Sequence, residues 1–168
     1  MRDGGPHADQ VLPVVPMMTP RAGAGKVDIV VLGISTGGPQ GLKLVVPRLP
    51  QSFPVPLAIV LHMPIGYTEL YARKLNDLCA LDVTEAREGD EIVAGRVFLA
   101  PAGRHLSFRR AATQIRAHLD VRPLDTPHRP AVDVLFQSAA DVYGERTLGI
   151  VMTGMGADGR DGAAWIKA

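Results

Sequence analysis

The chain has 168 residues, of which 46% are hydrophobic and 21% are charged, and its formal net charge is +1. These values are typical of a single globular domain with a sizeable core, and the nearly neutral charge argues against nucleic acid or an anionic membrane as a partner. No apolar stretch approaches the roughly 18 residues of a membrane-spanning helix. The N-terminus does not match a signal peptide, because it contains an acidic residue and several prolines. We therefore expect no membrane insertion and a cytoplasmic location.

The chain carries one cysteine, Cys79, and five histidines. One cysteine cannot form a disulfide within the chain or a Cys-based zinc site, and the histidines show no H-x-E or H-x-x-x-H spacing. The sequence therefore predicts no metal and no cofactor. A lone thiol suits a reducing cytoplasm, and Cys79 lies in a leucine-rich helical pattern, so we interpret it as a core residue.

Residues 1–25 are rich in proline, glycine and alanine and show no hydrophobic periodicity. This composition is typical of a disordered leader, or of a linker that follows a preceding domain. We expect the folded domain to occupy residues 26–168.

The segment 27–40, VDIVVLGISTGGPQ, is an apolar run that ends at a serine among glycines. Its β-branched and aliphatic residues 29–32 predict a strand covered on both faces, and Pro39 is well placed to start a helix. Ser35 therefore lies in a tight strand-to-helix turn, within the G-x-S-x-G pattern of a nucleophile elbow. The same pattern also fits a turn that cradles a phosphate or that only closes a βα unit.

A second strand–helix unit follows the first. The next elements are a short helix, a buried strand and a longer helix, at residues 40–49, 56–61 and 66–80. Thr68 is predicted to cap the longer helix. Two such units in succession imply parallel strands joined by right-handed crossovers. The carboxyl ends of both strands then meet at one edge of the sheet, where His62 can approach Ser35.

The middle of the chain changes to short runs separated by glycine-containing turns, which predict antiparallel hairpins. These runs are residues 83–86, 96–100, 105–108 and 114–117. An amphipathic helix is then expected over 131–143, ended by Gly144, and a last buried strand over 147–152. A second glycine-rich turn, 153–159, leads into a final helix. Together these patterns predict an α/β, doubly wound fold, with a mostly parallel sheet flanked by helices and an antiparallel hairpin region in mid-chain.

Three strands thus end in complementary polar groups, namely Ser35, His62 and Asp158. A serine hydroxyl becomes a good nucleophile when an imidazole removes its proton, and a carboxylate orients that imidazole. The N–H groups of Met155 and Gly156 are candidates for stabilising an oxyanion. Taken singly, each polar group also has a structural interpretation: the serine as a helix cap, the histidine as bonded to backbone, and the aspartate as the N-cap of the final helix.

Two other folds are disfavoured by the order of the residues. An α/β-hydrolase has several strands before its elbow, and its acid precedes its histidine. Here one strand leads into the elbow, and His62 precedes Asp158. A dinucleotide site needs G-x-G-x-x-G and an acid at the end of the second strand, whereas this strand ends in a histidine.

Five separated motifs resemble those of one family in the family's own order, and together they are highly specific. They are GISTGGP at 33–39, LHMP at 61–64, APAGRH at 100–105, RPAVDVLF at 129–136 and TGMGADG at 153–159. The family is CheB, the chemotaxis protein-glutamate methylesterase and glutaminase. The resemblance covers about residue 26 to the end of the chain, which we interpret as the methylesterase catalytic domain.

The resemblance implies that Ser35 is the nucleophile, His62 the general base and then acid, and Asp158 the residue that orients the histidine. It places Thr36 and the Met155 N–H beside the nucleophile as supporting residues. It implies hydrolysis of γ-glutamyl methyl esters on the cytoplasmic helices of methyl-accepting chemoreceptors, and deamidation of receptor glutamines. His105 matches a family position but is expected to shape the fold or the cleft rim.

Two departures from the family pattern bear on regulation and stability. Family members usually carry an N-terminal receiver domain, phosphorylated on an aspartate, that covers the active-site cleft; here residues 1–25 hold only the short leader. The family's catalytic domain also continues beyond the helix that follows Asp158. We therefore expect a catalytic domain cut short at its C-terminus and reduced in stability. A non-catalytic receptor-binding module is the alternative function.

Overall fold

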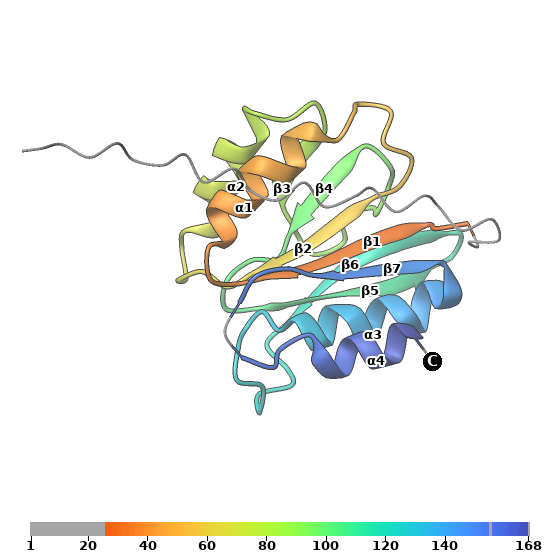
Figure 1. Cartoon of the computed structure of the whole chain (residues 1–168). Coiled ribbons are helices and arrows are strands. Elements are labelled where there is room, and N and C mark those ends of the chain that lie inside the picture. Colours follow the sequence, from red (N-terminus) through yellow and green to blue (C-terminus); the bar gives the residue numbers. More distant parts are fainter. Residues whose placement is uncertain (1–25, 155, 168) are drawn as a thin grey trace, which may run out of the picture.

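The computed structural model describes residues 26–154 and 156–167, so the predicted leader, 1–25, lies outside the described residues. The described part has three layers: a parallel sheet in the middle and helices on both of its faces (Figure 1). The doubly wound α/β architecture expected from the sequence is confirmed.

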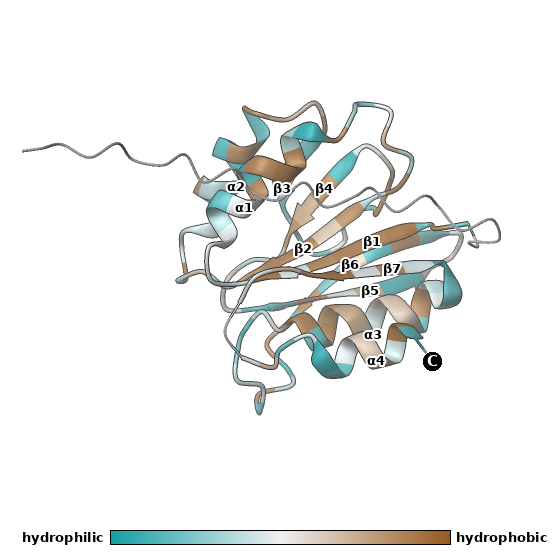
Figure 2. Cartoon of the chain, in the orientation of Figure 1, coloured by the Kyte–Doolittle hydropathy of each residue, from teal (hydrophilic) through white to brown (hydrophobic). Residues whose placement is uncertain are grey.

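The central sheet has five strands in the order β3-β4-β2-β1-β7, and every neighbouring pair is parallel. In chain order the strands are β1 Ile29–Ile34, β2 Leu57–Leu61, β3 Asp82–Glu85, β4 Arg96–Leu99 and β7 Thr147–Val151. All residues of β1 and β2 are buried, because helices cover both faces of the sheet. Figure 2 shows that β1 is hydrophobic over most of its length.

Helices pack on each face of the sheet in pairs (Figure 1). One face carries α1 Gly38–Val45, continued by the 3₁₀ turn Val46–Arg48, and α2 Thr68–Asn76; the other carries α3 Val132–Tyr143 and α4 Arg160–Lys167. Two hydrophobic clusters result, one containing Leu42 and Leu75 and the other containing Leu135 and Phe136. The sheet therefore separates two cores, and the strand ends lie at the edge between them.

Among the described residues, the two antiparallel strands form a hairpin, β5 His105–Ala111 with β6 Gln114–Asp120, which packs against α3. The other two short runs were expected to be antiparallel as well, and that expectation is wrong: β3 and β4 pair in parallel and extend the main sheet. The last three residues of β4 are all buried. A continuous apolar run of this kind is typical of a strand covered on both faces rather than of a half-exposed hairpin.

Two expectations concerned helix ends: the one for Thr68 is wrong, and the one for Gly144 is confirmed. Thr68 does not cap α2: it is the first helical residue, and its buried hydroxyl donates to the Glu85 carboxylate and accepts the Ala102 N–H. Gly144 does end α3, in the left-handed region at φ 58. No helix in the described ranges has the length and apolar character to cross a membrane.

Candidate active site

The turns after β1 and β2 meet at the carboxyl edge of the sheet, as the parallel pairing requires. Ile34 and Leu61 are register partners, so Ser35 and His62 each follow the end of their strand. The Ser35 N–H donates to the Thr153 carbonyl at 2.9 Å, and the His62 N–H donates to the Ile34 carbonyl at 3.3 Å. These backbone bonds fix three turns, those after β1, β2 and β7, against one another.

Ser35 and His62 line a common cavity of about 60 Å³, and Asp158 lines it too. Ser35 is partly buried, and its carbonyl accepts the N–H of Gly38, the first residue of α1, at 2.8 Å. A β-carbon at Gly154 would lie 3.1 Å from the Ser35 β-carbon. The cavity wall is therefore in van der Waals contact with the serine, and only glycine fits there without a shift of the turn.

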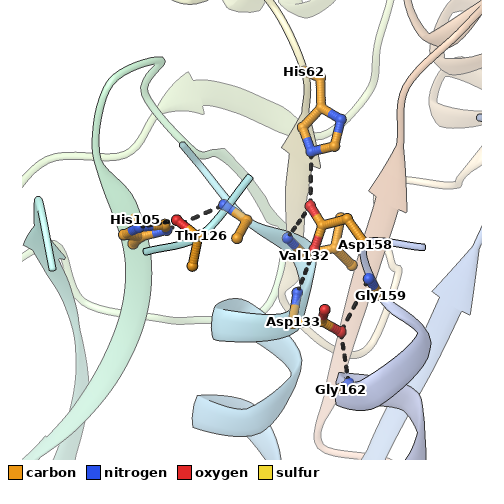
Figure 3. Close-up of polar contacts among 9 residues, drawn as sticks. His62, His105, Thr126, Val132, Asp133, Asp158, Gly159 and Gly162 are labelled. Atoms are coloured by element: carbon orange, nitrogen blue, oxygen red, sulfur yellow. Dashed lines mark hydrogen bonds and ion pairs between the residues drawn. The ribbon is translucent and has the colours of Figure 1, made fainter. Parts of the chain in front are cut away.

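His62 and Asp158 form a partly buried, hydrogen-bonded pair (Figure 3). His62 Nε2 lies 2.9 Å from Asp158 Oδ2, and the two side chains are 16% and 7% exposed. Because the carboxylate is the acceptor, Nε2 carries the proton in the neutral ring. The other ring nitrogen, Nδ1, is buried and has no hydrogen-bond partner among the described residues, so its lone pair is free to accept a proton.

The Asp158 carboxylate has two further donors, both at the N-terminus of α3. Oδ2 accepts the Val132 N–H at 2.8 Å, and Oδ1 accepts the Asp133 N–H at 3.0 Å. Burial would raise the pKa of Asp158, but the bonds from His62 and from these two backbone groups outweigh it and lower the pKa below its ordinary value. Asp158 is therefore held as an anion beside the imidazole.

His128 stacks on the imidazole of His62, with ring centroids 4.2 Å apart and planes inclined by 24°. It also lines the cavity. The Gly103 N–H donates to the neighbouring Arg129 carbonyl at 3.0 Å, and the Ala131 N–H donates to Nδ1 of His105 at 3.1 Å. The loop that carries His128 is thus anchored on its C-terminal side.

His105 is a buried residue of β5, 1% exposed. Its Nε2 lies 3.1 Å from the Pro123 carbonyl, at the other end of the same loop. Burial lowers the pKa of His105, which favours the neutral ring that Ala131 requires as an acceptor. This position agrees with the expectation that His105 shapes the fold rather than taking part in chemistry.

Ser35, His62 and Asp158 line one cavity, and Gly156, predicted as an oxyanion residue, lines it too; the catalytic roles of these residues stay predictions. Among the described residues no hydrogen bond joins the Ser35 hydroxyl to His62. Thr36 is exposed and does not line the cavity; its carbonyl accepts the Thr153 hydroxyl at 2.7 Å. Met155 lies outside the described residues.

Sequence reasoning missed two residues of this site, His128 and Asp133. His128 stands alone in a proline-rich loop, and its only signal is its place next to the 129–136 motif. Asp133 belongs to that motif, but nothing in the pattern indicates its partners. Within the described ranges, no group of three or more His, Cys, Asp or Glu side chains is placed to hold a metal ion.

Comparison with known proteins identifies close similarity over most of the chain. The family model described as CheB methylesterase matches residues 30–168. The chain is 51% identical over 148 residues to protein-glutamate methylesterase/protein-glutamine glutaminase 5 of Myxococcus xanthus, which covers 88% of this chain and 42% of that protein. It is 45% identical over 147 residues to the protein-glutamate methylesterase/protein-glutamine glutaminase of Treponema pallidum, which covers 88% of this chain and 36% of that protein.

A solved structure shares the fold. The CheB methylesterase catalytic domain of Thermotoga maritima superposes with a TM-score of 0.81 at 39% sequence identity, over 85% of this chain and 76% of that domain. The chain spans about two-fifths of the length of the two relatives named above, at 42% and 36%.

Proposed function

The chain belongs to the CheB methylesterase family, and from this membership we propose that it is a serine hydrolase that removes methyl groups from the glutamate γ-methyl esters of chemoreceptors. The same site deamidates receptor glutamines, because an ester and an amide pass through the same acyl-enzyme. The observation that carries the proposal is the His62–Asp158 pair at 2.9 Å, with Nδ1 unpartnered at a cavity that Ser35 also lines.

Acylation begins when the Ser35 hydroxyl attacks the ester carbonyl and His62 Nδ1 takes its proton. Asp158 keeps the opposite ring nitrogen protonated and stabilises the imidazolium that forms. Backbone N–H groups of the glycine-rich turns, including that of Gly156, stabilise the oxyanion of the tetrahedral intermediate, with Thr36 and Met155 as supporting residues. The intermediate collapses, the imidazolium returns the proton to the leaving oxygen, and methanol departs.

Deacylation repeats these steps with water as the nucleophile. His62 removes a proton from water, the hydroxide attacks the acyl carbonyl, and Ser35 leaves with the proton returned to its oxygen. The product is a glutamate side chain. With a glutamine substrate the group that leaves in the first half is ammonia, and the second half is unchanged.

The partners follow from the same membership. We expect the substrate to be the cytoplasmic helical region of methyl-accepting chemoreceptors, and a phosphorylatable receiver domain to regulate access to the site. Both stay predictions, as does the cytoplasmic location.

The deciding experiment compares methanol release from methylated receptor by the wild-type chain and by Ser35→Ala. The proposal requires release by the wild type and its loss in the variant. The other hydroxyl among the described lining residues, that of Thr153, donates to the Thr36 carbonyl at 2.7 Å. Receptor binding at equal affinity by both chains, with no methanol from either, would instead establish the receptor-binding module.

A further inference from the structure

The first turns of α3 and α4 are capped by each other's aspartates (Figure 3). Asp158, which precedes α4, accepts the first N–H groups of α3, at 2.8 and 3.0 Å. In return, Asp133 in the first turn of α3 accepts the Gly159 N–H at 3.0 Å and the Gly162 N–H at 2.6 Å through a single oxygen, Oδ1. Each helix therefore relies on a carboxylate from the other for N–H groups that its own turn leaves unpaired.

This exchange replaces the local capping that the sequence predicts. An aspartate before a helix ordinarily accepts N–H groups two or three residues further along its own turn. Asp158 points away from its own helix toward α3 and His62 instead. It can do so because Asp133 supplies the acceptor that α4 needs.

Close packing fixes the two turns in this arrangement. A β-carbon at Gly162 would lie 2.6 Å from the β-carbon of Phe136 and 3.0 Å from the α-carbon of Asp133. Such distances are well inside van der Waals contact, so only glycine allows the approach. The absence of a side chain at Gly162 is what brings its N–H within reach of Asp133.

We propose that Asp133 is a positioning residue for the hydrolytic site: by capping α4 it holds the turn of Asp158 so that this carboxylate faces His62. This inference rests on the proposed function for its kinetic consequence, but its structural consequence, the orientation of His62, is independent of turnover. Asp133 does not line the cavity, so it acts only through Asp158.

The kinetic test uses the full chain with Asp133→Ala, Asp133→Asn and Asp158→Asn. Asp133→Ala removes the acceptor, and we expect kcat to fall about 10-fold to 100-fold with KM unchanged, the size of effect typical of a misplaced catalytic group. Asp133→Asn keeps an oxygen at the acceptor position and recovers most of the rate. In the Asp158→Asn background, Asp133→Ala causes no further fall in kcat, because Asp133 acts only through Asp158.

A matched control separates positioning from general loss of stability. Thr147→Val removes the bond from a buried hydroxyl to the Ala139 carbonyl, at the amino end of β7 and away from the site. We expect it to lower the melting temperature, as Asp133→Ala does, and to leave kcat unchanged.

The second readout is the tautomer of His62, measured by NMR of the ring nitrogens in the wild type and in Asp133→Ala. We expect the proton on Nε2 in the wild type and a mixture of Nε2 and Nδ1 protonation in the variant. An unchanged tautomer, an additive loss of kcat in the Asp158→Asn background, or an equal loss in Thr147→Val would each overturn the proposal. If the wild-type chain releases no methanol, the proposed function fails, and the tautomer still decides the role of Asp133.

Discussion

Ser35 and Asp158 lie in the two glycine-rich turns that follow β1 and β7, but they are held in place in different ways. Ser35 is held through its backbone: its carbonyl accepts the Gly38 N–H three residues away at 2.8 Å, and its N–H donates to the Thr153 carbonyl at 2.9 Å. The Asp158 side chain is held by backbone groups of α3, 25 and 26 residues away in sequence, and by His62, 96 residues away.

The comparison shows that the nucleophile is placed through its backbone, whereas the acid is placed through its side chain by tertiary hydrogen bonds. Removing the serine hydroxyl removes a reacting group but no described hydrogen bond of the fold. Removing the Asp158 carboxylate removes the acceptor for two N–H groups of α3 as well as the partner of the imidazole. The two residues should therefore differ in what their loss does to stability.

The largest expected effects come from Ser35→Ala and Asp158→Asn, which test this difference directly. Each should lower kcat by about 10⁴-fold or more, because the serine and the acid of such a triad act as a unit. Ser35→Ala should change the free energy of unfolding by less than about 0.5 kcal/mol. Asp158→Asn should cost about 1–3 kcal/mol, because the amide places a donor against a buried N–H group. Denaturant unfolding of both variants checks this. Equal free energies of unfolding would contradict the proposed difference between Ser35 and Asp158.

Gly154→Ala tests the close contact between the Ser35 turn and the turn after β7. The new methyl group would lie 3.1 Å from the Ser35 β-carbon, so it must displace either the serine or the β7 turn. We expect kcat to fall about 10-fold to 100-fold, the cost typical of a small misplacement, with a modest fall in melting temperature. Unchanged turnover would show that the serine turn tolerates movement.

The stacked ring of His128 gives a smaller effect. His128→Ala removes a face-to-face contact at 4.2 Å from His62, and we expect kcat to fall about 3-fold to 10-fold, in line with the energy of an aromatic pair. His128→Phe keeps a planar ring at this position and should retain most of the rate. The ratio of kcat between the two variants measures the contribution of stacking.

The smallest expected effect is a dependence of the free energy of unfolding on pH. The pKa of Asp158 is lower in the folded chain than in the unfolded chain, so the unfolded chain binds more protons in the window between the two values. The stabilisation from this carboxylate is therefore complete above its unfolded pKa of about 4, and it is lost as the pH falls through the lower, folded pKa. The stability difference between wild type and Asp158→Asn should shrink over this window in denaturant titrations; a difference that is constant with pH would contradict it.

Much of the fold was readable from the sequence because its main signals are local. The buried runs that became β1, β2 and β7 are nearly continuous in apolar residues, and glycines mark the turns that follow β1 and β7. Because the carboxyl ends of parallel strands share one edge, the convergence of Ser35, His62 and Asp158 followed from their positions alone. The hairpin was also predicted, since its two runs are separated by a short turn.

Other features depended on which elements pack together. The parallel pairing of β3 with β4 comes from burial on both faces of the sheet, which short runs between turns do not reveal. The sequence predicted Asp158 as a local cap or a catalytic acid, and only the packing of α4 on α3 directs its carboxylate to α3 and His62.

The sequence by itself determined the strand ends, the residues that stand at them and the family to which they belong. The tertiary structure decided the partners of those residues: His128 on the face of the imidazole, and Asp133 as the acceptor for α4. The physical reason is the distance along the chain over which each feature is determined. Turn geometry and burial patterns are set by neighbours in sequence, whereas a buried donor or acceptor is satisfied by whichever group the packed elements bring within hydrogen-bond distance.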